Sequence, residues 1–298
     1  MTMPRQVVPG WMYMLTRRCT QRQFLLRPDP QTNNAFIYCL AEAAARFDIE
    51  VILPVAMSNH HHTNLYDRYG NVIEFVEHFH KMLAKCMNAF RGRWENFWSS
   101  ESVSIVRLVD VADAIDKIVY AATNPVKDGL VERAQDWPGV NGLSALLDRR
   151  VLEATRPPFF FREDGPMPAS VTLQLTIPPE LGESAAVLDV IRERVAAVEA
   201  RHDAKRMRSG QRVLGRRRVL RQSWRDSPSS QEPRRTLNPR VAARSLWSRL
   251  DALSRNREFV EKYREARIAW LEGTPIPFPR GTYWLRRFVG VPVVAENN

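Results

Sequence analysis

The sequence lacks any long hydrophobic run, although 44% of its 298 residues are hydrophobic. No stretch approaches the roughly 20 consecutive apolar residues that a transmembrane helix requires. The start of the chain also lacks the basic and then apolar pattern of a secretory signal. These absences exclude a helical membrane protein, and they predict a globular, cytoplasmic protein with one large or two modest domains.

Cysteine is equally scarce. The three cysteines, Cys19, Cys39 and Cys86, are odd in number, widely separated and without a CxxC spacing. This pattern argues against a disulfide framework and against a zinc ribbon. We therefore expect the three thiols to be small buried hydrophobic groups.

Acidic residues are few in the last third of the chain. Residues 201–298 hold 23 Lys and Arg against 9 Asp and Glu, a net charge of +14, whereas residues 1–200 carry a net charge of −3. Arginine suits phosphate geometry, and neutralising phosphates releases counterions, so the pattern predicts a polyanionic partner, nucleic acid above all. An anionic membrane is less favoured, because no separate amphipathic helix accompanies the arginines. A solvated basic segment without a specific partner stays open. The expected DNA contacts are Arg206, Arg208, Arg212, Arg216, Arg217, Arg218 and Arg221.

Hydrophobic periodicity indicates an alternation of strands and helices over the first 123 residues. The expected strands are 11–16, 49–57, a segment at the histidines and 104–109, and the expected helices are 33–47, 72–90 and 110–123. This order predicts an α+β fold with a ferredoxin-like or RRM-like antiparallel sheet and helices on one face. Strand 49–57 reads as central, although Pro54 favours an edge or a bulge. Helix 33–47 has Asn33 or Asn34 as its expected cap.

The whole chain divides into three predicted parts. Residues 1–145 are predicted to form a catalytic domain, 146–185 a loop-rich connector, and 186–298 a basic, mainly helical DNA-binding extension. Within the extension, helices are expected at about 188–206 and 239–272. Five tryptophans could stack on unpaired bases, but core packing is the expectation for most of them. They are Trp94, Trp98, Trp247, Trp270 and Trp284.

Two features carry possible chemistry. His60, His61 and His62 are consecutive, and strand alternation would place His60 and His62 on one face and His61 on the other. Two imidazoles on one face make half of a metal site, or merely a polar strand end. Tyr120 and Asn124 are four residues apart, so they share a helix face. Taken alone, such a tyrosine is typical of a core position and such an asparagine of a helix end.

Together these features resemble a known family. The segments MSNHHHTNLYDRYGN, NAFRGRWENFW and IVYAATNPVKDGLVERAQDWPGV, in this order, are similar to the single-tyrosine HUH transposases, specifically the REP-associated tyrosine transposases. The resemblance runs from about residue 8 to residue 140. It departs from the family in having His61 where a plain hydrophobic residue stands between the two metal-binding histidines.

The resemblance implies a metal-dependent transposase, that is, a DNA strand-transfer nuclease. Tyr120 would be the nucleophile, and His60, His62 and Asn124 would bind Mg²⁺ or Mn²⁺. The metal would polarise the scissile phosphate, while Tyr120 attacks single-stranded DNA near a hairpin and forms a 5′-phosphotyrosine link. Hairpins of palindromic repeats would be the partner, and the protein would act as a monomer or homodimer. Two alternatives stay open, a non-catalytic hairpin-binding descendant of the family and an RNA-binding module of the same sheet topology.

Overall fold

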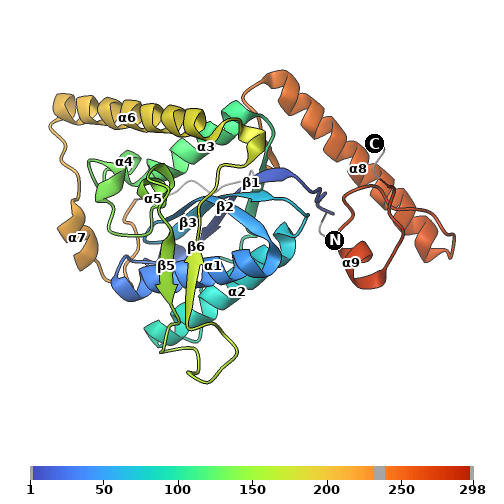
Figure 1. Cartoon of the computed structure of the whole chain (residues 1–298), viewed down its shortest axis with the longest axis horizontal. Coiled ribbons are helices and arrows are strands. Elements are labelled where there is room, and N and C mark those ends of the chain that lie inside the picture. Colours follow the sequence, from blue (N-terminus) through green and yellow to red (C-terminus); the bar gives the residue numbers. More distant parts are fainter. Residues whose placement is uncertain (1–2, 231–238, 296–298) are drawn as a thin grey trace.

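The computed structural model describes residues 3–230 and 239–295. The part of the arginine-rich stretch at residues 231–238 therefore lies outside the described residues. In the described chain, five strands form the main sheet in the order β2-β3-β1-β4-β7 (Figure 1). In chain order they are β1 (Trp11–Arg18), β2 (Ile49–Ala56), β3 (His60–Asp67), β4 (Ser104–Leu108) and β7 (Val241–Ala242). The predicted order of strands and helices up to residue 122 is confirmed, and the fold mixes α and β structure.

Strand β2 lies at the edge of this sheet, so the prediction of a central strand was wrong. Among the described strands it pairs only with β3, and its register shifts between Val51 and Leu53. Pro54 has no N–H to donate, which suits an edge position. A returning loop covers this edge, where Gly142 donates its backbone N–H to the Pro54 carbonyl at 2.9 Å.

Helices cover both faces of the sheet, whereas the sequence predicted helices on one face. Helices α1 (Pro30–Phe47) and α2 (Val72–Arg91) lie on one side, and α3 (Val111–Ala122) lies on the other (Figure 1). The histidines of β3 show this division, because the His61 ring contacts Phe36 and Phe79 of α1 and α2 while His62 contacts α3. Helix α1 also begins earlier than predicted, since Asp29 rather than Asn33 or Asn34 caps it by accepting from the Thr32 N–H at 2.7 Å.

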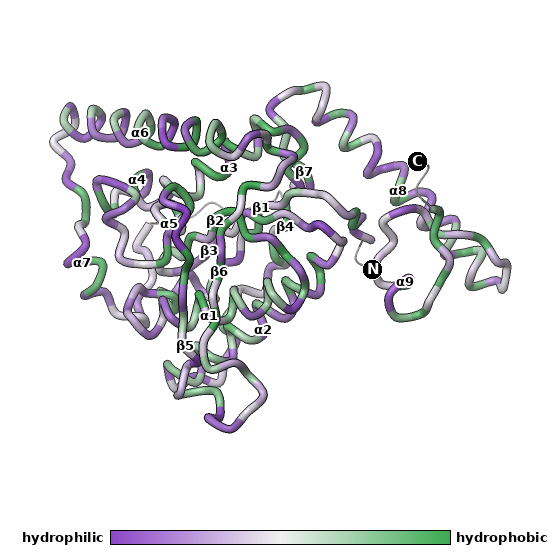
Figure 2. Tube along the Cα trace, viewed as in Figure 1, coloured by the Kyte–Doolittle hydropathy of each residue, from purple (hydrophilic) through white to green (hydrophobic). Residues whose placement is uncertain are grey.

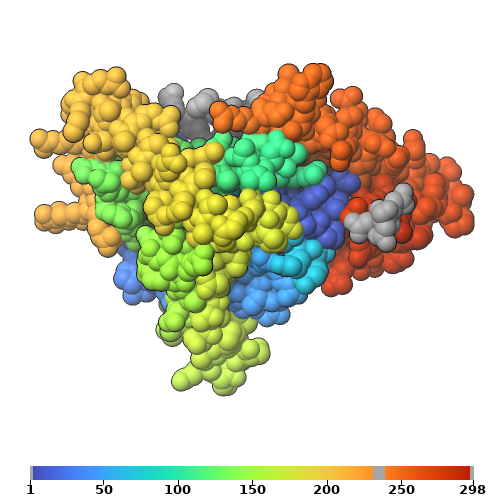
Figure 3. Space-filling model, turned by 45° about the horizontal axis from the view of Figure 1, so that its top comes forward, coloured from blue at the N-terminus to red at the C-terminus, as the bar shows by residue number. Residues whose placement is uncertain are grey.

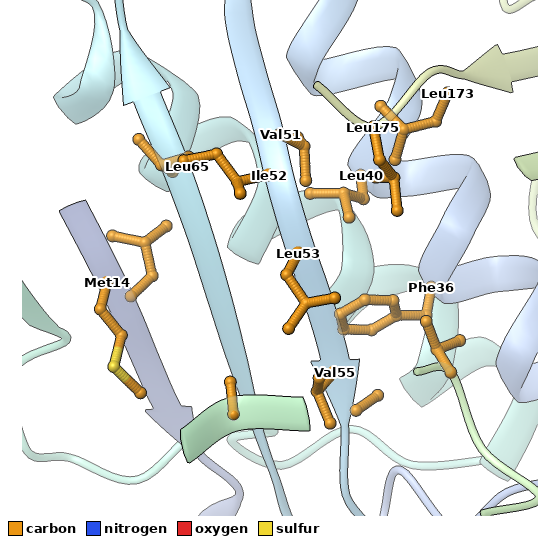
Figure 4. Close-up of a cluster of buried hydrophobic side chains, with 14 of the residues drawn as sticks. Met14, Phe36, Leu40, Val51, Ile52, Leu53, Val55, Leu65, Leu173 and Leu175 are labelled. Carbon is orange, nitrogen blue, oxygen red and sulfur yellow. The ribbon is translucent and has the colours of Figure 1, made fainter. Parts of the chain in front are cut away.

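One part of the main core lies between β2 and α1. Phe36 and Leu40 of α1 point toward Leu53 and Val55 of β2 (Figure 4), and all four side chains are fully buried. Apolar alternation on the strand and helical spacing on α1 bring these faces together. The three cysteines are free and buried in this core, which confirms their expected role.

The region predicted as a loop-rich connector contains a small β-hairpin. Strands β5 (Leu152–Thr155) and β6 (Ser170–Leu173) pair antiparallel, and the loop that joins them projects from the molecule (Figure 3). The hairpin packs on α1, where the Tyr38 hydroxyl donates to the Pro168 carbonyl at 2.7 Å. Four short helical segments flank this region. They are α4 (Asn124–Lys127), η2 (Ala134–Asp136), α5 (Leu143–Leu147) and η3 (Pro179–Leu181), and a further 3-10 turn, η1 (Thr20–Arg22), follows β1.

The C-terminal part is mainly helical, in helices α6 (Ser184–Ser209), α7 (Arg216–Arg221), α8 (Leu246–Leu271) and α9 (Trp284–Val289). Hydrophobic and hydrophilic residues alternate along α6 (Figure 2). Its apolar side, which includes Ile191 and Val195, is buried in the same core as the sheet. The helix predicted from about 239 begins only at Leu246, because Ser245 caps it and the preceding residues pair in parallel with β4. Among the described residues, no helix is both long and apolar enough to cross a membrane.

Candidate active site

The three histidines at the start of β3 divide between the two faces of the sheet. His60 and His62 point to the α3 side, with ring centroids 4.9 Å apart. His61 is fully buried on the other side, where its Nε2 lies 2.9 Å from Nε2 of His80. Only His60 and His62 can therefore act as a pair on one surface.

Each of these two imidazoles has its Nδ1 engaged by a neighbouring oxygen. Thr16 lies opposite His62 in the β1–β3 register, and its Oγ1 is 2.8 Å from His62 Nδ1. The Asn59 Oδ1 lies 2.7 Å from His60 Nδ1. Such contacts fix the orientation of an imidazole and direct Nε2 toward a ligand. Sequence analysis did not identify Thr16, because its pairing with His62 depends on strand register.

Helix α3 and the short helix α4 bring Tyr120 and Asn124 to His62. The Tyr120 ring lies 5.5 Å from the His62 ring, and Asn124 Nδ2 lies 3.0 Å from His62 Nε2. Asn124 is 5% exposed, while Tyr120 is 40% exposed. The structure thus places a buried amide and an accessible phenol around one imidazole.

These side chains line a cavity of about 1220 Å³. Tyr120, Asn124, His60 and His62 meet there with Thr16. Another wall is formed by residues 226–230. Their backbone is joined to the N-terminal part of the chain by a hydrogen bond from the Phe24 N–H to the Asp226 carbonyl at 2.9 Å. No motif in the sequence points to this wall, since its position depends on a contact between distant segments.

Two lysines lie next to the Tyr120 ring. Lys127 Nζ is 4.2 Å from the ring centroid, and Lys117 Nζ is 5.6 Å away. Burial, followed by the charges of Arg201 and Lys117, lowers the pKa of the Lys127 ammonium group. Sequence analysis missed both lysines, although Lys117 precedes Tyr120 by one helical turn and so shares its face.

The candidate metal ligands are two imidazoles and one amide. The Asn124 Oδ1 is buried and has no hydrogen-bond partner among the described residues, and rotation of the amide would exchange this oxygen with Nδ2. Two nitrogen donors and one oxygen donor fit Mn²⁺, which accepts both kinds of ligand, and fit Mg²⁺ less well. No cluster of three or more His, Cys, Asp or Glu side chains in the described residues could hold a metal ion. Any metal here would therefore complete its coordination with water or substrate oxygens.

The seven arginines predicted to contact DNA lie apart from this cavity. Arg206 and Arg208 belong to the end of α6, Arg212 to the turn that follows, and the others to α7. Arg206 is partly buried and pairs with Asp203 at 3.2 Å, whereas the other six are exposed. None of the seven lines the cavity, so their role stays a prediction.

The tryptophans differ from expectation. Of the five, Trp98 alone is buried, and its Nε1 donates to the His80 carbonyl at 2.9 Å. Trp94 and Trp247 are 97% and 81% exposed, and Trp270 and Trp284 are also exposed. Core packing was thus the wrong expectation for four of them, because they lie on a loop and on the C-terminal helices, outside the main core.

Comparison with known proteins yields a distant structural likeness. No family model matches the chain, and no curated protein matches it in sequence. Among solved structures, it is similar to a REP-associated tyrosine transposase bound to a REP hairpin, with a TM-score of 0.42 and 18% identity over 49% of this chain and 84% of that chain. A likeness this distant does not define a family, so the functional conclusion depends on the side chains themselves.

Proposed function

We propose that this chain is a metal-dependent DNA strand-transfer nuclease of the transposase type, with Tyr120 as the nucleophile. The observation that carries the proposal is the convergence of Tyr120, Asn124, His60 and His62 in one cavity. The resemblance of the sequence to the REP-associated tyrosine transposases agrees with it. So does the strand order 2-3-1-4 within the sheet, which is that of a ferredoxin-like fold.

The reaction exchanges one phosphodiester for another. The phenolic oxygen of Tyr120 loses its proton and attacks phosphorus, a bond to the tyrosine forms, and the bond to the 3′ oxygen breaks. The 3′ oxygen takes a proton and becomes a 3′-OH, which can reverse the reaction in a later strand transfer. Because phosphodiester energy is conserved in the 5′-phosphotyrosine, no nucleotide cofactor is required.

The chain's own residues support each part of this step. His60, His62 and Asn124 would hold Mn²⁺ or Mg²⁺, which would polarise the non-bridging oxygens of the phosphate. Lys127 and Lys117, beside the Tyr120 ring, stabilise negative charge on the phenolic oxygen. Thr16 and Asn59 keep the two imidazoles oriented. Single-stranded DNA next to a hairpin is the substrate we propose, with Arg208 at the end of α6 and the exposed arginines of α7 on the hairpin.

A covalent-adduct assay tests this proposal. The protein is incubated with labelled single-stranded DNA from the palindromic repeats that flank its own gene, with Mn²⁺ or with EDTA, and the products are separated on a denaturing gel. We expect an Mn²⁺-dependent protein–DNA band that is absent with Tyr120→Phe. Hairpin binding without an adduct under any metal would refute the nuclease and leave a DNA-binding protein.

Histidine variants separate catalysis from folding in the same assay. His60→Ala and His62→Ala should abolish the adduct while hairpin affinity is unchanged. His78→Ala is the matched control, because His78 belongs to α2 on the other side of the sheet and does not line the cavity of His60 and His62. Equal loss of adduct and binding in the His60 and His62 variants would instead indicate a structural role for these side chains.

A further inference from the structure

A second, strongly basic pocket of about 710 Å³ adjoins Tyr120 on the side of α6. Five cationic side chains line it, together with His202, Asp113 and Asp116. The cations are Lys117, Lys127, Arg201, Lys205 and Arg244. Tyr120 lines both this pocket and the larger cavity of His60 and His62, so it stands at the boundary between them.

Helix α6 supplies three of these residues from a fixed position. Its apolar side is buried in the main core, and Arg194 donates to Asp116 of α3 at 2.6 Å. Near its middle, Glu199 accepts from the Ala134 backbone N–H at 2.8 Å. Figures 1 and 3 show α6 lying along α3. Arg201, His202 and Lys205 are therefore presented to Tyr120 by a rigid helix and not by a mobile tail.

The positive charge of this pocket is largely uncompensated. The Asp116 carboxylate forms ion pairs with Arg194 and Arg244, at 2.6 and 3.7 Å. Lys127, Arg201 and Lys205 form no ion pair within 4 Å among residues 3–230 and 239–295. Crowded cations without partners are unfavourable in the empty protein, and an anion would relieve their repulsion. Burial and the neighbouring charges already lower the pKa of Lys127, which agrees with this crowding.

The geometry of phosphoryl transfer indicates which DNA segment suits the pocket. The attacking and leaving oxygens lie on opposite sides of phosphorus. The 3′ oxygen therefore departs on the side away from Tyr120, within the larger cavity, together with the strand upstream of the cut. The downstream strand stays bonded to the same phosphorus through its 5′ oxygen, so it can pass beside Tyr120 toward α6.

We propose that the pocket formed by Lys127, Arg201 and Lys205 binds the sugar–phosphate backbone of single-stranded DNA immediately downstream of the scissile phosphate. This inference rests on the proposed function, because it assigns a direction to the strand that Tyr120 attacks. The pocket holds the segment that remains attached to Tyr120 after cleavage. It thereby keeps the 5′-phosphotyrosine product in place while the 3′-OH strand is exchanged.

The salt dependence of binding tests the pocket without requiring cleavage. Binding of a dT20 oligonucleotide is measured by fluorescence anisotropy across a salt series, in a Tyr120→Phe background. Each lost contact to a single strand lowers the slope of log K against log salt by about 0.7, so Arg201→Gln with Lys205→Gln should lower it by about 1.4. The matched control, Arg257→Gln with Arg264→Gln on α8, removes the same charge from an exposed helix outside both pockets. An unchanged slope in the pocket variant, or an equal loss in the control, would overturn the inference.

The direction of the strand is tested with neutral methylphosphonate linkages, placed singly on either side of the mapped cut in the hairpin substrate. In the parent protein, a neutral linkage downstream should weaken binding several-fold, and the pocket variant should lose this sensitivity. Loss of sensitivity upstream instead would overturn the assignment of direction. Failure of the proposed function gives a different result, since a protein that binds DNA without forming an adduct would have no cut to map, while the pocket variant would still lower the slope for dT20.

Discussion

The His62 imidazole lies between two protein groups, Thr16 on Nδ1 and Asn124 on Nε2. Thr16 would contact neither the metal nor the DNA, but its hydrogen bond to Nδ1 fixes the orientation of the imidazole ring. Loss of such an outer contact typically costs 10- to 100-fold in metal affinity. We expect Thr16→Val, which keeps the shape of the side chain, to raise the Mn²⁺ concentration for half-maximal adduct formation by about tenfold or more.

Thr63 provides the control for this substitution. It lies on β3 next to His62, is fully buried, and has its Oγ1 on the His61 side of the sheet at 3.1 Å from His61 Nδ1. Thr63→Val should therefore leave the Mn²⁺ requirement unchanged. If Thr16→Val and Thr63→Val have the same requirement as the parent, Thr16 does not orient the metal ligand.

The ammonium group of Lys127 lies close to other cations, and its positive charge would stabilise the phenolate form of Tyr120. Burial, followed by the charges of Arg201 and Lys117, lowers the pKa of this ammonium group, which lies over the Tyr120 ring. Removal of this charge should slow phenolate attack at neutral pH, and a rise in pH should compensate by increasing the phenolate fraction. We expect Lys127→Met to reduce the adduct rate at pH 7 by about tenfold and to shift the pH–rate profile toward alkaline pH.

The conservative variant Lys127→Arg keeps a cation at the same place and should restore much of the rate. Measurement of single-turnover adduct formation from pH 6 to 9 distinguishes the variants. A profile of Lys127→Met that only drops in height, without moving along the pH axis, would contradict a charge effect on the phenol.

Among the helices, α6 connects the C-terminal part to the sheet. Ile191 is fully buried where α6 packs against the rest of the core. Replacement of a buried isoleucine by alanine removes contacts and leaves a cavity. We expect Ile191→Ala to lower the free energy of unfolding by about 2–4 kcal/mol in one cooperative transition, measured by urea denaturation.

The exposed neighbour Glu193 is the matched control on the same helix, and Glu193→Ala should change stability by less than about 0.5 kcal/mol. Two separate unfolding transitions, with only one affected by Ile191→Ala, would show that α6 belongs to an independent unit as the predicted boundary at residue 186 implies.

The elements of the first 123 residues could be predicted because their signals are local. The apolar run of β1 and the helical spacing of α2 depend only on nearby residues. The spacing of Tyr120 and Asn124 is also local, although the predicted single helix is divided in the structure into α3 and α4, with Thr123 between them. The two faces of β3 were also predictable, since alternation alone separates His61 from its neighbours. These local signals place the four residues on their elements, whereas their assignment to one site came from the resemblance to the REP-associated tyrosine transposases.

The contributions of distant segments could not be predicted in this way. Strand β7 has two residues and pairs with β4 across more than 130 positions of sequence. The packing of α6 on α3, which brings Lys205 and Arg201 to Tyr120, depends on tertiary contacts that no local pattern encodes. Charge counting found the basic region, but it favoured the crowded arginines of α7 over Arg201 and Lys205, which line the pocket beside Tyr120.

At the scale of the whole molecule, we expect two buried histidines to lower the stability in acid. His61 and His80 are buried together among Phe79 and Trp98. Burial lowers the pKa of His61 well below its usual value and that of His80 to about 3. The unfolded chain therefore binds protons below about pH 6.5 that the folded protein does not, so stability present above pH 6.5 is lost as the pH falls.

Each such histidine should contribute about 1.4 kcal/mol of lost stability per pH unit below 6.5. Urea denaturation at pH 7.5, 6.5 and 5.5 measures this loss before most carboxyl groups titrate. Equal free energies of unfolding at pH 7.5 and 5.5 would show that these two histidines are not held neutral by the fold.

The distribution of charge over the molecule leads to the last prediction. Helix α7 is anchored by the fully buried Val219 and by backbone bonds from Leu214 and Gly215 to Gly129 and Leu130, immediately after α4. Its exposed arginines are thereby held at a fixed position relative to the candidate active site, where a hairpin stem next to the cut strand would lie. The arginines to be replaced in the test are Arg216, Arg217 and Arg218.

Each contact to a duplex phosphate contributes about 0.9 to the salt slope, so replacing these three arginines by glutamine should lower the slope for hairpin DNA by up to about 2.7. Binding of dT20 should change little, because that strand follows the pocket on α6.

The matched control replaces Arg249, Arg257 and Arg264, three exposed arginines of α8 at the opposite end of the molecule (Figure 1). An equal effect of both triple variants on the hairpin would mean that net charge alone attracts DNA, and an unchanged hairpin slope would remove α7 from the duplex interface. A selective effect would instead assign the stem to α7 and the single strand to the pocket on α6, on either side of α4, which carries Asn124 and Lys127.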